Sequence, residues 1–101
     1  MQYIVDEMID FDHAIGKVIE FARNDGNTLV IITADHETGG LSLVAGNIST
    51  GAVEGKFTTG SHTGVMIPVF AYGPGAEQFS GIYQNSDIFH KILSAFRFKK
   101  K

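Results

Sequence analysis

Two ionisable side chains, Asp35 and His36, stand directly after an apolar run in the stretch NTLVIITADHETGG (residues 27–40). A carboxylate and an imidazole are both good zinc ligands, and a strand end holds them more firmly than a free loop would. Neighbouring side chains on a regular strand point to opposite faces, so both can reach one ion only if the chain bends there. Gly39 and Gly40 permit such a bend. By itself, however, this dipeptide is more often a buried histidine paired with its neighbouring aspartate, or two solvated loop residues.

A third candidate ligand, His62, lies in the stretch TTGSHTGV, immediately before another predicted strand. Its small neighbours let the backbone or a ligand come close. A lone loop histidine is usually structural or solvated, so the significance of His62 depends on Asp35 and His36. Glu37 could accept a hydrogen bond from a metal-bound imidazole. We nevertheless expect an exposed loop glutamate and leave it out of the predicted site.

Other kinds of catalytic site find no support in the sequence. None of the serines lies in a G-x-S-x-G context, and there is no Walker loop or G-x-G-x-x-G fingerprint. We expect surface or packing roles for His13 and His90. A metal site is therefore the chemistry that the residues favour.

The elements that would position these residues follow from the spacing of apolar side chains. From Ile4 to Ala22 they recur every three or four residues, which predicts a long amphipathic helix. Residues 24–26, Asn-Asp-Gly, are of the types that end helices. The β-branched run from Thr28 to Thr33 does not alternate, which is typical of a central strand in the parallel part of an α/β sheet.

The second half of the chain is less regular. Residues 41–45 and 65–72 are strand candidates, although Pro68 removes one amide hydrogen from the latter. Residues 46–64 are dense in Gly, Ser and Thr, which predicts a long loop. Asn85 or Ser86 would cap a final helix. We expect residues 28–33 to form an interior strand flanked by residues 65–72 or 41–45, with both long helices packed on the sheet.

Composition limits the alternatives. With 101 residues, 44% hydrophobic and 19% charged, the chain suits one domain, residues 1–101, with a modest core. A net charge of −3 gives no reason to bind nucleic acid, and the basic tail around Arg97 is expected to be solvated. No apolar run approaches the ~20 residues of a membrane span, and no signal-peptide pattern is present. The predicted fold class is α/β, a partial sheet flanked by helices that looks like part of a larger sheet.

Three stretches together resemble the alkaline phosphatases, two-zinc phosphomonoesterases with a three-layer α/β/α fold. They are YIVDEMIDFDHAIGKVIEFA, DGNTLVIITADHETGGLSL and GSHTGVMIPVFAYGPGAEQFSG, which cover nearly the whole chain. The resemblance implies that the chain is a C-terminal part of the catalytic domain. It also implies that Asp35 and His36 bind the zinc that activates the nucleophile. His62 would bind the other zinc, which stabilises the leaving oxygen.

The resemblance also implies what the chain lacks. In the family, the serine nucleophile with its acidic ligand, the phosphate-binding arginine and the magnesium-site residues lie in the N-terminal half. An Asp and a His that complete the leaving-group zinc site precede the first helix of this chain. We therefore expect the parent enzyme to hydrolyse phosphate monoesters through a phosphoserine, with two zinc ions and magnesium. The 101 residues alone would be inactive, would hold zinc poorly, and would self-associate or require the N-terminal half, with a homodimer also possible.

Two rivals remain open. Sulfatases, phosphodiesterases and phosphomutases have a similar kind of metal site, but the motifs HETGG and HTG together with AYGPGA favour a phosphomonoesterase. A free-standing, non-catalytic metal-binding or interaction domain is the alternative of a different class. Family members are commonly exported, so the resemblance implies a periplasmic or extracellular parent.

Overall fold

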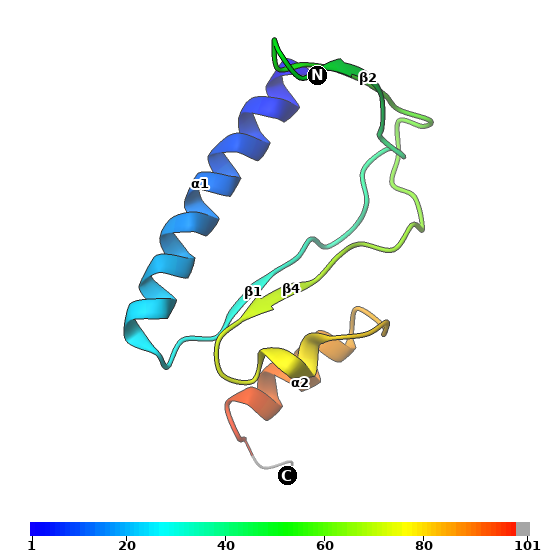
Figure 1. Ribbon diagram of the computed structural model, residues 1–101. Coiled ribbons are helices and arrows are strands. Elements are labelled where there is room, and N and C mark those ends of the chain that lie inside the picture. Colours follow the sequence, from blue (N-terminus) through cyan, green and yellow to red (C-terminus); the bar gives the residue numbers. More distant parts are fainter. Residues whose placement is uncertain (99–101) are drawn as a thin grey trace. The chain divides into compact units, whose positions relative to one another are not determined.

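The computed structural model describes residues 1–98, which form two helices, four short strands and one 3₁₀ turn (Figure 1). Residues 99–101, in the tail predicted to be solvated, lie outside this range. The chain divides into two compact units, one of residues 1–16 and 36–67, the other of residues 17–35 and from 68 onward. In chain order the elements are α1 (Gln2–Asp25), β1 (Val30–Ile32), β2 (Ser42–Asn47), β3 (Ala52–Lys56), β4 (Phe70–Tyr72), η1 (Ala76–Phe79) and α2 (Asp87–Ala95).

Helix α1 confirms the predicted amphipathic helix, and it ends where the sequence indicates. Gly26 adopts a left-handed φ of 73° and donates its amide hydrogen to the Ala22 carbonyl at 2.9 Å. Such a conformation costs glycine little, since it has no Cβ. The Asp25 carboxylate then accepts hydrogen bonds from the Asn27 amide and the Thr28 hydroxyl, which fixes the turn into β1.

The apolar stripe of α1 is mostly uncovered. Buried hydrophobic side chains among the described residues are limited to Ala22, Val30 and Phe79, whereas Met8 of α1 is 60% exposed. No residue of α2 is buried. The expected packing of both long helices on the sheet is therefore not achieved within residues 1–98. The reason is size, since pairs of short strands offer too little surface to cover a helix of 24 residues.

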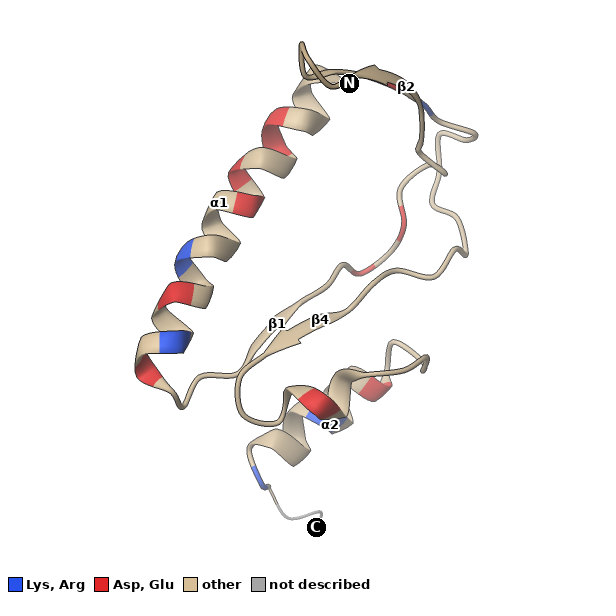
Figure 2. Cartoon of the chain, viewed as in Figure 1, with Lys and Arg blue, Asp and Glu red and all other residues tan. Residues whose placement is uncertain are grey.

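Charge is also concentrated on α1, where acidic side chains occupy much of the first half (Figure 2). Within residues 1–98, no helix is long and apolar enough to cross a membrane.

In the second unit, β1 pairs with β4 in antiparallel register, Val30 opposite Tyr72 and Ile32 opposite Phe70 (Figure 1). The expectation that residues 65–72 flank residues 28–33 is confirmed for the paired part. The expectation of a parallel neighbour is wrong, because a non-alternating apolar run indicates cover on both faces but does not specify strand direction. Across residues 1–98, β4 is the one strand that pairs with β1, so a central position is not formed there.

The AYGPGA segment turns the chain from β4 into η1. Gly73, at a φ of 107°, packs against the carbonyl of Thr28, where any Cβ would collide. Helix α2 begins at Asp87 as expected, but the Ser86 side chain makes no capping hydrogen bond. The Asp87 carboxylate accepts instead from the amide of Gln84, which ties the preceding turn to the positive end of the helix.

The first unit contains a β-hairpin whose first strand, β2, confirms the strand candidate over residues 41–45 and whose second strand, β3, lies where a loop was expected. Strands β2 and β3 pair antiparallel from Ser42 opposite Lys56 to Asn47 opposite Ala52. The prediction of a loop over residues 46–64 is therefore wrong up to Lys56, and β2 pairs with β3 instead of flanking β1. The Asn47 side chain closes the turn by accepting hydrogen bonds from the two amides that follow Ile48.

Candidate metal centre

Two segments that are distant in sequence lie side by side in the first unit, residues 36–40 (HETGG) and residues 58–63 (TTGSHT). Backbone hydrogen bonds at Gly39 join them. The Gly39 amide donates to the Ser61 carbonyl at 3.0 Å, and its carbonyl accepts from the amides of Thr58 and Thr59. The two motifs singled out in the sequence are thus neighbours in space.

The imidazole rings of His36 and His62 are the chemical centre of this junction. Their centroids lie 3.5 Å apart with 38° between the ring planes. Both side chains are exposed. Two of the three predicted ligands are therefore brought together at the surface of one unit, although 26 residues separate them.

The tautomer of His36 follows from its neighbour. Its Nδ1 lies 2.8 Å from the backbone carbonyl oxygen of Glu37. A carbonyl oxygen can only accept, so Nδ1 is the donor, and in the neutral ring the lone pair is on Nε2. Metal-binding histidines commonly have this arrangement, in which a carbonyl on one ring nitrogen orients the other.

Asp35, the third predicted ligand, belongs to the second unit, where it follows β1. It is exposed, and it takes part in an interaction within the structure. Its convergence with the two histidines remains a prediction. Across residues 1–98, no group of three or more His, Asp or Glu side chains is arranged to hold one metal ion.

Glu37 is the residue that the sequence interpretation misjudged. We expected an exposed loop glutamate, but its side chain is half-buried between the two segments. One carboxylate oxygen accepts from the Gly40 amide at 2.6 Å. The other accepts from the Thr63 amide at 3.2 Å and from the Thr63 hydroxyl. The Thr63 hydroxyl, followed by the backbone amides of Gly40 and Thr63, lowers the pKa of Glu37 by stabilising the carboxylate, although partial burial opposes them.

The two glycines of HETGG are required by this geometry. Gly39 and Gly40 have left-handed φ values of 68° and 61°. A Cβ on Gly39 would lie 2.6 Å from the Phe57 ring and 3.0 Å from the Thr59 carbonyl oxygen. A Cβ on Gly40 would collide with the Thr58 hydroxyl. The predicted bend after Asp35 and His36 is confirmed, and the close approach of the second segment explains why it needs glycine.

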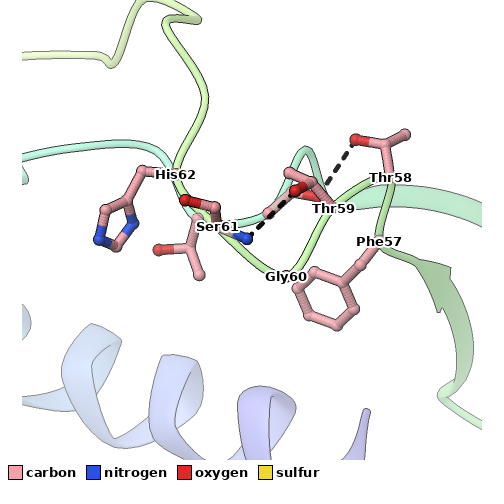
Figure 3. A pocket seen from close by; sticks show the side chains of 8 residues that line it. Phe57, Thr58, Thr59, Gly60, Ser61 and His62 are labelled. Carbon is pink, nitrogen blue, oxygen red and sulfur yellow. Dashed lines mark hydrogen bonds between the residues drawn. The ribbon is translucent and has the colours of Figure 1, made fainter.

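An open pocket of about 510 Å³ adjoins His62. Figure 3 shows the His62 imidazole at one end and the Phe57 ring at the other. Along the lining, the Thr59 hydroxyl accepts from the Ser61 amide, and the Thr58 hydroxyl donates to the Gly39 carbonyl. Thr38, Gly39 and Gly60 complete the lining, so the pocket offers hydroxyl groups and one aromatic wall beside an imidazole.

The two imidazoles are ligands of the type that zinc prefers. Imidazole nitrogen is a standard zinc ligand, and the bond from His36 to a backbone carbonyl is of the type that orients such ligands. No lysine or arginine occurs in either of the joined segments. A cation would therefore meet two imidazoles without competition from a neighbouring positive side chain in these segments.

Comparisons with known proteins agree with the motifs. The sequence model of the alkaline phosphatase family matches residues 1–55 and 47–98. An alkaline phosphatase of Escherichia fergusonii is 34% identical over 90% of this chain, which spans 23% of that protein.

Solved structures extend the likeness to the fold. Alkaline phosphatase from the Antarctic bacterium TAB5 superposes with a TM-score of 0.80 and 51% identity, covering 90% of this chain and 28% of that enzyme. A mutant of the TAB5 enzyme with Mg bound in the M3 site gives a TM-score of 0.86 and 46% identity over 98% of this chain and 31% of the mutant. The chain thus spans between about a quarter and a third of the length of these proteins, and it has the partial α/β fold of that segment.

Proposed function

Because this chain belongs to the alkaline phosphatase family, we propose that it supplies part of the metal centre of an enzyme that hydrolyses phosphate monoesters. The observation that carries the proposal is the pair of imidazoles, His36 and His62, held 3.5 Å apart by the junction of HETGG with TTGSHT. These are two of the three residues that match the family's zinc-binding motifs.

The charges of the site support a metal. A phosphate monoester is a dianion at alkaline pH, yet the joined segments contain no lysine or arginine, and Glu37 adds a negative charge. A bound cation would supply positive charge for such a substrate where these two segments have none. Two zinc ions would supply positive charge and would lower the pKa of the serine and water nucleophiles.

The residues of this chain would serve as metal ligands and as part of the surface that binds the substrate. His36, with Nδ1 held by the Glu37 carbonyl, would use Nε2 toward the zinc at the nucleophile, together with Asp35. His62 would bind the zinc at the leaving oxygen. The pocket that begins at His62 would then receive the alcohol part of the ester, with Phe57 as its apolar wall.

We propose that the 101 residues are inactive without the rest of the enzyme. A catalytic zinc usually has three protein ligands and one open position, so a two-metal site needs about six. Asp35, His36 and His62 provide three, divided between two ions. The proposed reaction also proceeds through a phosphoserine, and none of the serines in the chain lies in a nucleophile motif.

A chimera tests this proposal. Residues 1–98 of this chain would replace the matched segment of the TAB5 enzyme, which is similar enough in fold for the exchange. With an activated aryl phosphate, zinc and magnesium at alkaline pH, the chimera should turn over substrate. The variants His36→Ala and His62→Ala should each lose at least about a hundredfold in kcat/KM, whereas His13→Ala, on the exposed face of α1, should not.

The isolated chain is assayed beside it. We expect no turnover above that of a blank purification and no stoichiometric tight zinc binding by calorimetry. Turnover by the isolated chain that disappears in His36→Ala would contradict the proposed incompleteness. An active chimera that tolerates alanine at both histidines would contradict the proposed metal site.

A further inference from the structure

Glu37 contacts His36 with its backbone and the residue that follows His62 with its side chain. Its backbone carbonyl accepts from His36 Nδ1 at 2.8 Å. Its carboxylate accepts from the backbone and hydroxyl of Thr63, the residue next to His62. The same carboxylate also accepts from Gly40, at the end of the HETGG bend. One side chain therefore links the residue after one imidazole to the residue after the other.

We propose that Glu37 is a positioning residue whose carboxylate ties Thr63 to the HETGG bend and so holds the His36 and His62 rings side by side.

The remaining connections between the two segments are weaker in kind. They are neutral backbone bonds at Gly39 and one hydroxyl bond from Thr58 to the Gly39 carbonyl. Hydrogen bonds to an ionised carboxylate are stronger than those between neutral groups. Three such bonds converge on Glu37, and the two from Thr63 restrain the backbone directly beside His62. Loss of the carboxylate would leave His62 held from its N-terminal side alone, through the Gly39 bonds to residues 58–61, of which the bond to the Ser61 carbonyl directly precedes His62.

The exposure of the rings makes this tie necessary. His36 and His62 are both exposed, so packing does not hold them in place. The His36 ring is oriented by the bond of its Nδ1 to the Glu37 carbonyl, and restraint of the backbone beside His62 limits how far the second ring can move from the 3.5 Å centroid distance. Glu37 and Thr63 are half-buried under the junction and are positioned to fix them.

The first experiment uses the metal-free 101-residue chain, labelled with ¹⁵N. Amide hydrogen exchange at Gly40 and Thr63 reports the two bonds that amides donate to the carboxylate, and a nuclear Overhauser contact between the His36 and His62 rings reports their proximity. In Glu37→Gln we expect exchange at Thr63 to become at least about tenfold faster and the ring contact to be lost. Glu54→Gln, the same change of charge in the exposed strand β3 of this unit, should leave both unchanged.

A second pair of variants removes the partner and leaves Glu37 intact. Thr63→Val deletes the hydroxyl with little change in shape, and Thr63→Ser retains it. We expect the ring contact to weaken in Thr63→Val and to survive in Thr63→Ser. If Glu37→Gln should unfold the unit, this pair decides the question. Equal ring contacts in Thr63→Val and Thr63→Ser would overturn the proposal, as would a Glu37→Gln chain that behaves like Glu54→Gln.

The inference rests on the proposed function in one respect, that the His36 and His62 rings are metal ligands. In the chimera, Glu37→Gln should lower zinc affinity about tenfold or more, because residues that orient metal ligands have effects of this size. Unchanged affinity would overturn the positioning role. A chimera that binds no zinc at all would refute the proposed function, and the metal-free ring contact would still test the tie by itself.

Discussion

Replacement of Gly39 by alanine should loosen the junction of HETGG with TTGSHT far more than the same change at a matched glycine. Gly39 has a φ of 68°, and an added Cβ would lie 2.6 Å from the Phe57 ring and 3.0 Å from the carbonyl oxygen of Thr59. Gly51, in the hairpin turn of the same unit, has a φ of 70° and nothing within 4 Å of its Cβ position. Both variants share the backbone penalty, and Gly39→Ala alone adds the collision.

The magnitudes separate the two variants. A left-handed alanine costs about 1–2 kcal/mol, partly offset by about 0.4–1 kcal/mol from the smaller entropy of the unfolded chain. Gly51→Ala should therefore destabilise its turn by about 1 kcal/mol. Overpacking adds about 1–3 kcal/mol, since the Phe57 ring can rotate away but the Thr59 carbonyl belongs to the backbone bonded to Gly39.

Amide exchange measures this difference locally. The Thr58 and Thr59 amides donate to the Gly39 carbonyl, so their exchange reports the junction. An added 1–3 kcal/mol corresponds to about a 5- to 150-fold faster exchange in Gly39→Ala than in Gly51→Ala. Equal exchange in the two variants, with the His36–His62 ring contact preserved in both, would refute the claim that close approach dictates glycine at this position.

Three further predictions concern acidity, the uncovered helix and the metals. The pKa of Glu37 is lowered in the folded chain, so the hydrogen bonds to its carboxylate stabilise the fold above the unfolded pKa near 4.5, and this stabilisation is lost as the pH falls through the folded pKa. In the wild type, protection of the Thr63 amide from exchange should therefore decline over that pH range, whereas in Glu37→Gln it should not change with pH. The exposed apolar stripe of α1 should drive self-association of the chain. Changing both Phe11 and Val18 to Gln should raise the dissociation constant measured by sedimentation about tenfold or more, whereas Ile48→Gln, in the hairpin turn, should leave it unchanged. Chelation of zinc should abolish turnover by the chimera, and activity should return on addition of zinc; turnover that persists after complete removal of metal would contradict the proposed mechanism.

Local patterns predicted much of the secondary structure. The three- and four-residue spacing of apolar side chains located α1, and the Asn-Asp-Gly signal located its end at Asp25. Apolar runs located β1 and the paired part of β4. These features depend on neighbours in sequence, so they are visible without the fold. The direction of pairing depends on how the connecting chain returns, and the apolar run contains no information about it.

The second strand of the hairpin and its pairing with β2 were missed because burial does not form them. All residues of β2 are exposed, and β3 is nearly so. Their pairing depends on backbone hydrogen bonds and on a turn closed by Asn47, in a segment whose Gly, Ser and Thr content is typical of loops. A strand without a buried face has no apolar alternation to reveal it.

The role of Glu37 was missed for a related reason. Its partner Thr63 is 26 residues away, and a glutamate after Asp-His is locally indistinguishable from a solvated one. The available signal was the combination of HETGG with HTG, two short motifs rich in small residues that together suggest close approach. Motif spacing could therefore suggest His36 and His62 as partners, whereas the residue that ties them needed the three-dimensional arrangement.

The central claim is that Asp35, His36 and His62 are ligands in a two-zinc centre. The most direct measurement is anomalous diffraction at the zinc edge from crystals of the chimera. We predict two zinc peaks, one bonded to Asp35 and to His36 Nε2 and the other to a ring nitrogen of His62, each nitrogen at about 2.0–2.1 Å from its metal. Fully occupied zinc sites that exclude the two histidines, or an active chimera without zinc at these residues, would contradict the account.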